Sequence, residues 1–77
     1  MELYYFESCP YCVRVLDFLR GKSHDITMKD TANHSEFREE LKAINNGITQ
    51  VPCLVIEGRP MLESLDIIEY LKGILSA

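Results

Sequence analysis

The sequence predicts an α/β domain in which three helices flank a four-stranded mixed sheet, in the order β-α-β-α-β-β-α. Stretches rich in β-forming residues alternate with stretches whose apolar residues recur at helical spacing. The first strand–helix–strand unit must cross over right-handed and gives parallel strands, whereas a short turn late in the chain adds an antiparallel pair. With 77 residues the chain has room for one domain, residues 1–77, because a second core could not be built from the remainder.

The first strand, the first helix and the second strand follow from local composition. Residues 1–6 are rich in β-forming side chains and predict a strand. Pro10 marks the start of a helix, because the N–H that proline lacks would have no partner there anyway. Gly21 marks the end of that helix. Residues 24–29 alternate weakly between apolar and polar and predict a short second strand.

The second helix and the third strand have clearer boundaries. Asn33 followed by Glu36 matches a capping arrangement, so a helix is expected to start there. Residues 45–47 (Asn-Asn-Gly) close that helix. Residues 53–57 (Cys-Leu-Val-Ile-Glu) form a nearly continuous apolar run, which is typical of a strand covered on both faces.

A hairpin and a last helix complete the predicted fold. Gly58 and Arg59 are candidates for a tight turn, and residues 60–62 can start its antiparallel partner. Ser64 is a natural N-cap for the last helix. The buried side of that helix is expected to comprise Ile67, Ile68, Leu71, Ile74 and Leu75.

Composition argues against several classes of function. The chain has 12 acidic and 8 basic side chains, a formal charge of −4, and no cluster of Lys and Arg that could follow nucleic-acid phosphates. No apolar stretch approaches the roughly 20 residues needed to span a bilayer. The N-terminus shows no basic segment followed by an apolar core and a cleavage site. We therefore expect a cytoplasmic monomer that binds neither nucleic acid nor membrane.

The Cys9-Pro10-Tyr11-Cys12 motif lies where the first strand leads into the first helix. A helix N-terminus presents unpaired N–H groups and partial positive charge, which stabilise a thiolate at Cys9. Cys12 lies one turn further along, and residues i and i+3 are neighbours on a helix. One cysteine can therefore attack a disulfide while the other resolves the mixed disulfide that forms. In a reducing cytoplasm such pairs are more often catalytic or metal-binding than structural.

Other interpretations of the cysteine pair stay open. A zinc site usually combines two such pairs, or one pair with closely spaced histidines. Here His24 and His34 lie ten residues apart, so no metal is expected. A purely structural disulfide and an unreactive buried pair are two further possibilities for Cys9 and Cys12.

These motifs together resemble the dithiol glutaredoxins of the thioredoxin superfamily. Residues 9–12 (Cys-Pro-Tyr-Cys) after an N-terminal strand are similar to their active site. Residues 50–52 (Gln-Val-Pro) before a late apolar strand resemble their Thr-Val-Pro element, whose proline is cis. The likeness covers nearly the whole chain: its length, the order of its elements, both motifs and the final turn into a helix. It implies a thioredoxin fold with the active site at one helix terminus.

The resemblance implies a role for each matching residue. Cys9 would be the nucleophile that forms a mixed disulfide with glutathione, and Cys12 the resolving thiol. Tyr11 would flank the glutathione chain, although ordinary surface packing explains it as well. Val51, ahead of a cis Pro52, would offer its backbone N–H and C=O to the tripeptide. An X-Pro bond favours trans only weakly, and a bend here exposes the main chain of Val51 beside Cys9.

Three parts of the sequence weaken the transfer of the family's residue roles to this chain. Residues 62–66 (Leu-Glu-Ser-Leu-Asp) replace a Gly-Gly-Cys/Ser-Asp-Asp turn and look more like the Glu-Ser element of glutathione S-transferase N-terminal domains. The Ser64 hydroxyl and helix amides would take the glutamyl carboxylate, and Glu63 its ammonium; a plain helix cap is the alternative. Phe6 replaces a Lys that helps to hold the thiolate and the glycine carboxylate. Arg38 is either a ligand of that carboxylate or a solvated charge.

The resemblance implies a glutathione-dependent thiol–disulfide oxidoreductase, active in electron transport and cell redox homeostasis. Its partners would be glutathione, as co-substrate, and disulfide-containing or glutathionylated proteins; no tightly bound cofactor is expected. The alternatives are a thioredoxin-like reductant served by a flavoprotein reductase, a non-catalytic glutathione-binding module, and a dimer that shares an iron–sulfur cluster through Cys9 and glutathione. Cys53 is expected to pack as a small hydrophobic residue, with a regulatory or glutathionylated thiol as the alternative.

Overall fold

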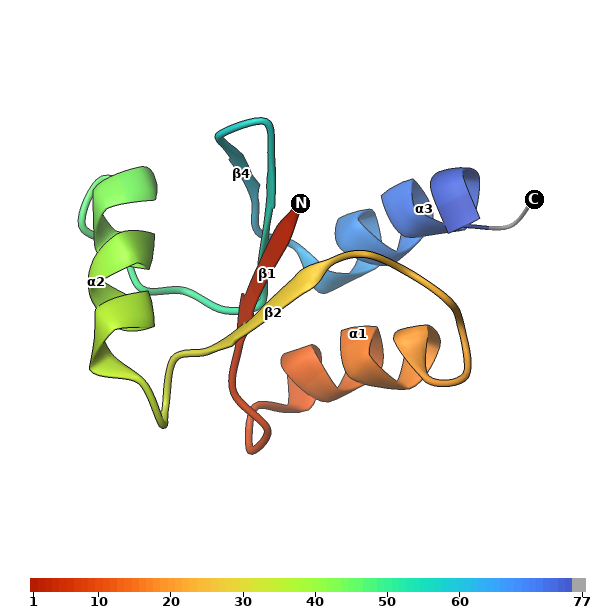
Figure 1. The fold of residues 1–77 in the computed structure, drawn as a ribbon, viewed down its shortest axis with the longest axis horizontal. Coiled ribbons are helices and arrows are strands. Elements are labelled where there is room, and N and C mark those ends of the chain that lie inside the picture. The colour runs from red at the N-terminus through yellow and green to blue at the C-terminus, as the bar shows by residue number, and fades with distance from the viewer. Residues whose placement is uncertain (76–77) are drawn as a thin grey trace.

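The structure, a computed structural model, describes residues 1–75 and has the predicted order of strands and helices (Figure 1). The elements are β1 (Glu2–Tyr5), α1 (Pro10–Leu19), β2 (Thr27–Asp30), α2 (Ser35–Ile44), β3 (Cys53–Ile56), β4 (Arg59–Met61) and α3 (Ser64–Leu75). The sheet has the strand order β2-β1-β3-β4. β1 is parallel to β2 and antiparallel to β3, which is antiparallel to β4. The predicted mixed α/β fold is confirmed.

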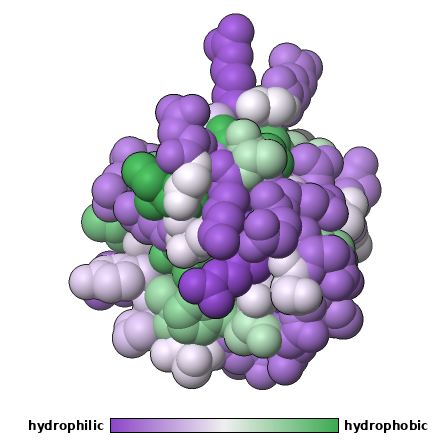
Figure 2. Space-filling view, turned by 90° about the vertical axis from the view of Figure 1, so that its left-hand side faces the viewer, coloured by the Kyte–Doolittle hydropathy of each residue, from purple (hydrophilic) through white to green (hydrophobic). Residues whose placement is uncertain are grey.

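The helices cover both faces of this sheet: α1 and α3 lie on one side and α2 on the other (Figure 1). Successive residues of a strand point to opposite faces, so Leu3 packs on the α1/α3 side while Tyr4 packs on the α2 side. The larger core, between the sheet and α1/α3, comprises Leu3, Val15, Leu19, Ile26, Leu54, Ile67 and Leu71. The core under α2 comprises Tyr4, Leu41, Cys53 and Val55. The outer surface on the α2 side is largely hydrophilic (Figure 2).

The hairpin turn lies one residue earlier than the sequence predicts. It consists of Glu57 and Gly58, whose φ angles are 51° and 80°. A two-residue hairpin turn of this kind requires positive φ at both central residues. Arg59 therefore belongs to β4, where it pairs with Ile56, and is not part of the turn.

Two predictions around β2 and α2 are wrong in detail. β2 begins at Thr27 rather than at residue 24, because His24 Nδ1 accepts a hydrogen bond from the backbone N–H of Ile26 at 3.2 Å. Asn33 does not cap α2, since its Nδ2 donates to Asp30 Oδ2 at 2.7 Å. Within residues 1–75, none of the helices is long and apolar enough to cross a membrane.

Candidate active site

The two cysteines of the Cys-Pro-Tyr-Cys motif lie where β1 leads into α1. Cys9 holds the N-cap position and Pro10 is the first helical residue, as predicted. The backbone N–H of Cys9 donates to the Phe6 carbonyl at 3.3 Å, and its carbonyl accepts from the N–H of Val13 at 3.0 Å. These bonds fix Cys9 at the partially positive end of the helix. Its side chain and backbone retain 8% exposure, whereas Cys12 is fully buried.

The Cys12 thiol stays protonated at neutral pH. Burial, reinforced by the neighbouring Cys9, raises the pKa of Cys12 to about 12. A hydrogen bond with the backbone of Phe6 lowers this pKa, but by less than burial raises it. The thiolate rather than the thiol is the nucleophile of disulfide exchange. The geometry therefore gives the two cysteines different tasks: Cys9 keeps a small exposure at the helix terminus, and Cys12, which keeps none, lies one turn further along α1.

The backbone of Val51 lies directly beside Cys9. The Cys9 thiol donates a hydrogen bond to the Val51 carbonyl, with an Sγ···O distance of 3.9 Å. The Val51–Pro52 peptide bond is cis, as the resemblance implies. Antiparallel pairing of β1 with β3, with Tyr4 opposite Cys53, brings the loop ahead of β3 next to the loop that follows β1. The sheet itself thus places Val51 at the cysteine motif.

A pocket of about 370 Å³ lies between Val51 and the start of α3. We call it the Glu63 pocket, and its lining residues are Tyr11, Gln50, Val51, Pro52, Leu62, Glu63 and Ser64. Five of the six residues that the resemblance assigns to glutathione binding thus lie together. Ser64 is the first residue of α3 rather than the residue ahead of it, and the N–H of Ile67 donates to the Glu63 carbonyl at 2.9 Å.

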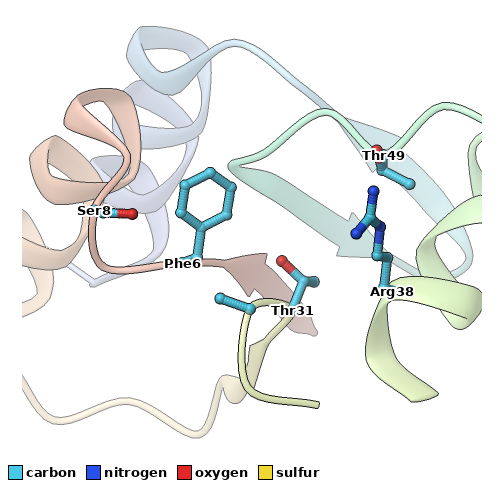
Figure 3. A pocket seen from close by; sticks show the side chains of 6 residues that line it. Phe6, Ser8, Thr31, Arg38 and Thr49 are labelled. Atoms are coloured by element: carbon cyan, nitrogen blue, oxygen red, sulfur yellow. The ribbon is translucent and has the colours of Figure 1, made fainter. Parts of the chain in front are cut away.

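The sixth residue, Arg38, lies in a different pocket of about 290 Å³. We call it the Arg38 pocket, and its lining residues are Phe6, Ser8, Thr31, Ala32, Arg38 and Thr49. The Phe6 ring stands between Ser8 and the Arg38 side chain, whose guanidinium points toward Thr49 (Figure 3). The two elements that flank this pocket, the end of β1 and helix α2, meet only through the tertiary fold.

Along the chain, Cys9 lies between residues that line the two pockets, although it lines neither itself. Phe6 and Ser8, which precede it in the chain, line the Arg38 pocket, and Tyr11, which follows it, lines the Glu63 pocket. The consecutive residues Thr49 and Gln50 divide in the same way. The pockets carry opposite charges, a guanidinium in one and a carboxylate in the other. Such a site can hold a thiol compound that has a cationic end and an anionic end.

Several pocket residues were absent from the sequence prediction. Three of them adjoin a predicted site residue in the chain, and that adjacency was a usable signal: Ser8, Gln50 and Leu62. The others lie in loops that no motif marks, and only the packing of α2 against the sheet brings them to the site: Thr31, Ala32 and Thr49.

Cys53 lies apart from this chemistry. It is fully buried in the core under α2, beside Tyr4, Leu41 and Val55, as the sequence predicts. Burial raises the pKa of its thiol to about 11, which keeps it protonated and unreactive. Among residues 1–75, no group of three or more His, Cys, Asp or Glu side chains is placed to hold a metal ion.

Comparison with curated proteins relates this chain to part of a longer isomerase. Maleylacetoacetate isomerase from Mus musculus is 36% identical to it over 73 residues, an alignment that covers 90% of this chain and 32% of the isomerase. The chain therefore spans about a third of the length of that relative.

Solved structures share the whole fold. Glutathione S-transferase 1-6 from Anopheles dirus species B matches with a TM-score of 0.76 and 25% identity, over 99% of this chain and 36% of that one. A bacterial Zeta-class glutathione S-transferase, maleyl pyruvate isomerase in its holo form, matches with a TM-score of 0.72 and 23% identity, over 100% of this chain and 37% of that one. A mutant of a thioredoxin-like protein matches with a TM-score of 0.72 and 24% identity, over 91% of this chain and 95% of that one.

A family model agrees with the motifs and with these structures. The model described as Glutaredoxin matches residues 1–61, a stretch that contains the cysteine motif, the cis-proline loop and all four strands. The chain belongs to the glutaredoxin family.

Proposed function

We propose that this protein is a glutathione-dependent thiol–disulfide oxidoreductase that reduces protein disulfides and glutathione mixed disulfides. The observation that carries the proposal is the position of Cys9 at the N-terminus of α1 and beside Val51, with its chain neighbours lining two pockets of opposite charge. Glutathione has a thiol in its middle, an ammonium and a carboxylate at its glutamyl end, and a second carboxylate at its glycyl end. Its charge pattern matches the two pockets when its sulfur lies at Cys9.

Each end of glutathione finds complementary groups in this arrangement. Glu63 takes the glutamyl ammonium, and the Ser64 hydroxyl with the unpaired N–H groups at the start of α3 takes the glutamyl carboxylate. Arg38 takes the glycyl carboxylate in the other pocket. The Val51 backbone pairs with the cysteinyl residue between them, and Tyr11 and Pro52 form the wall beside the chain.

The reaction is a sequence of thiol–disulfide exchanges. On a glutathionylated protein, the Cys9 thiolate attacks the glutathione sulfur, the Cys9–glutathione disulfide forms, and the protein thiol leaves with a proton. A second glutathione thiolate then attacks that glutathione sulfur, which releases oxidised glutathione and restores Cys9. On a protein disulfide, Cys9 attacks one sulfur and Cys12 then attacks Cys9, which releases the dithiol product. Two glutathione molecules reduce the resulting Cys9–Cys12 disulfide and leave as oxidised glutathione.

The environment of Cys12 suits this second role. In the free protein, burial is the main cause of the raised pKa of Cys12, and the neighbouring Cys9 adds to it. Formation of a mixed disulfide removes any charge from the Cys9 sulfur, so that contribution disappears when Cys12 has to act.

We place the protein in a reducing cytoplasm, as a monomer that uses glutathione as co-substrate and needs no tightly bound cofactor.

A second candidate function follows from the relatives. The chain is 36% identical to maleylacetoacetate isomerase and spans 32% of it, and its Glu63-Ser64 element lines the proposed glutamyl site. A protein of that kind would bind glutathione without exchanging disulfides. The dithiol at the helix terminus favours the first proposal, because simple binding needs neither Cys9 nor Cys12.

The test compares wild type, Cys9→Ser and Cys12→Ser, with Cys53→Ala as the matched control. With glutathione as reductant, Cys9→Ser should lose all turnover, whereas Cys12→Ser should keep activity on glutathionylated peptides and lose activity on protein disulfides. Cys53→Ala should keep both activities. Turnover by Cys9→Ser would exclude the mechanism. Wild-type activity only with a flavoprotein thioredoxin reductase in place of glutathione would favour the thioredoxin-like alternative instead.

A further inference from the structure

The Arg38 pocket is larger than the glycyl end of glutathione requires. Its volume is about 290 Å³, and it is partly open to solvent. A glycyl end brings only a methylene group and a carboxylate into this space. A pocket of this size leaves room for a side chain on the residue that follows the cysteine of the thiol substrate.

The lining of the pocket indicates what kind of side chain would enter. The Phe6 ring projects into the space between Ser8 and Arg38 (Figure 3), and Ala32 adds a methyl group to the lining. The Thr31 hydroxyl already donates to the Tyr5 carbonyl at 3.2 Å, so it needs no partner from a ligand. Phe6 and Ala32 therefore give the lining an apolar part, against which an apolar or aromatic side chain would pack.

The charge of the pocket indicates what such a group would carry at its end. Within residues 1–75, no carboxylate forms an ion pair with Arg38. Its guanidinium is therefore available for a bidentate contact with a ligand carboxylate. An apolar part and a single cation in one pocket match a residue that has an apolar side chain and a free carboxylate.

We infer that the Arg38 pocket selects thiol substrates of the γ-glutamylcysteinyl type whose last residue is apolar and ends in a free carboxylate, with Phe6 as the residue that discriminates. The pocket adjoins Cys9 through Ser8, and Thr49 of its lining precedes Gln50 and Val51 of the Glu63 pocket. A thiol compound bound at Cys9 would extend into both pockets. The inference rests on the proposed function, because it assumes that Cys9 exchanges disulfides with such a compound.

The experiment measures one chemical step with defined probes. Each probe is a mixed disulfide between a fluorescent reporter thiol and a tripeptide: γ-Glu-Cys-Gly, γ-Glu-Cys-Phe, or the C-terminal amide of γ-Glu-Cys-Phe. The Cys9 thiolate attacks the tripeptide sulfur, the Cys9–tripeptide disulfide forms, and the reporter thiol leaves with a proton. Wild type should release the reporter from the Phe-ended acid about tenfold faster than from the Gly-ended acid and about tenfold faster than from the amide.

Variants separate the contribution of Phe6 from that of Arg38. Phe6→Ala should abolish the preference for Phe over Gly while the Gly-ended probe still reacts, and Phe6→Leu should keep part of that preference. Arg38→Gln should abolish the preference for acid over amide. Arg59→Gln, on β4 and outside both pockets, is the matched control for loss of a cation and should keep both preferences.

Two outcomes would contradict the inference without touching the proposed function. Equal wild-type rates with the Phe-ended and Gly-ended acids would overturn it, and so would a Phe preference that survives in Phe6→Ala. No reporter release from any probe by wild type would be a failure of the proposed function itself. Because Phe6 belongs to neither core cluster, its substitutions should leave the fold intact, and circular dichroism of each variant checks this.

Discussion

The two pockets beside Cys9 are supported in different ways. The Glu63 pocket is backed by α3, which buries Ser64, Ile67 and Leu71 and shares the larger apolar core with α1. The Arg38 pocket depends on α2, which has Leu41 as its one fully buried residue. The apolar packing behind the Glu63 pocket does not depend on ionisation. The Glu63 pocket should therefore be the more rigid of the two.

A polar network compensates for the thin core under α2. Lys29 on β2 forms an ion pair with Glu40 on α2 at 2.6 Å, and the hydroxyl of the buried Tyr4 donates to the same carboxylate at 2.9 Å. The Lys29 ammonium also lies 5.3 Å from the centre of the Tyr4 ring. This network ties α2, and with it Arg38, to β1 and β2. The Glu63 pocket is thus supported by apolar packing, whereas the Arg38 pocket is supported by a smaller apolar core together with charge.

The largest expected effect concerns the Glu63 pocket. Glu63→Gln removes the charge that takes the glutamyl ammonium, and a hydrogen bond to a charged group contributes about 1.5–3 kcal/mol, so kcat/KM for a glutathionylated peptide should fall roughly 10- to 100-fold. The free energy of unfolding should hardly change, because Glu63 is exposed. Steady-state kinetics and urea unfolding measure the two quantities, with Glu57→Gln in the β3–β4 turn as the control. Unchanged kcat/KM in Glu63→Gln would remove Glu63 from the binding site.

The second effect concerns the Arg38 pocket and the polar network that ties α2 to the sheet. Tyr4→Phe removes the buried hydroxyl that donates to Glu40, which should lower the free energy of unfolding by about 1 kcal/mol at pH 7. Hydrogen exchange should become faster in α2 while α3 keeps its protection. Tyr70→Phe on α3, a half-buried position, is the matched control and should change neither quantity. Equal loosening of α2 and α3 in Tyr4→Phe would mean that the two ends of the site are not supported independently.

The difference in stability between wild type and Tyr4→Phe should also depend on pH, and this is the smallest of the expected effects. The hydrogen bonds from Lys29 and Tyr4 hold the pKa of Glu40 below its ordinary value of 4.5. The stabilisation is therefore complete above pH 4.5 and is lost as the pH falls through the lower native pKa of Glu40. The bond to Glu40 raises the pKa of Lys29 above 10.5, so the ion pair is also lost as the pH rises through that higher value. In a pH series of urea unfolding, the gap between wild type and Tyr4→Phe should be widest near neutrality and shrink toward pH 3; a constant gap would contradict the network.

Much of the fold and half of the site followed from local signals in the sequence. The cysteine motif, the Val51-Pro52 element and the Glu63-Ser64 pair are each short and contiguous, so a linear pattern reveals them. The position of the hairpin turn was missed, because Gly58 was paired with the following residue although the preceding Glu57 also adopts positive φ.

The remaining features depend on contacts between distant segments. Tyr4 and Glu40 are 36 residues apart in the chain, and no local pattern in either segment marks them as partners. The Arg38 pocket likewise collects residues from the end of β1, the loop after β2, helix α2 and the loop before β3. Such assemblies exist only after the sheet register and the docking of α2 are set.

The most direct test of the central claim traps the intermediate on Cys9. Cys12→Ser is incubated with oxidised glutathione, and intact mass with peptide mapping locates any glutathione that is bound covalently. The structure predicts one glutathione on Cys9, which keeps 8% exposure, and none on the fully buried Cys53. Reduced glutathione should remove the bound glutathione from Cys9. Modification of Cys53 instead of Cys9, or no covalent glutathione at all, would contradict the assignment of Cys9 as the nucleophile.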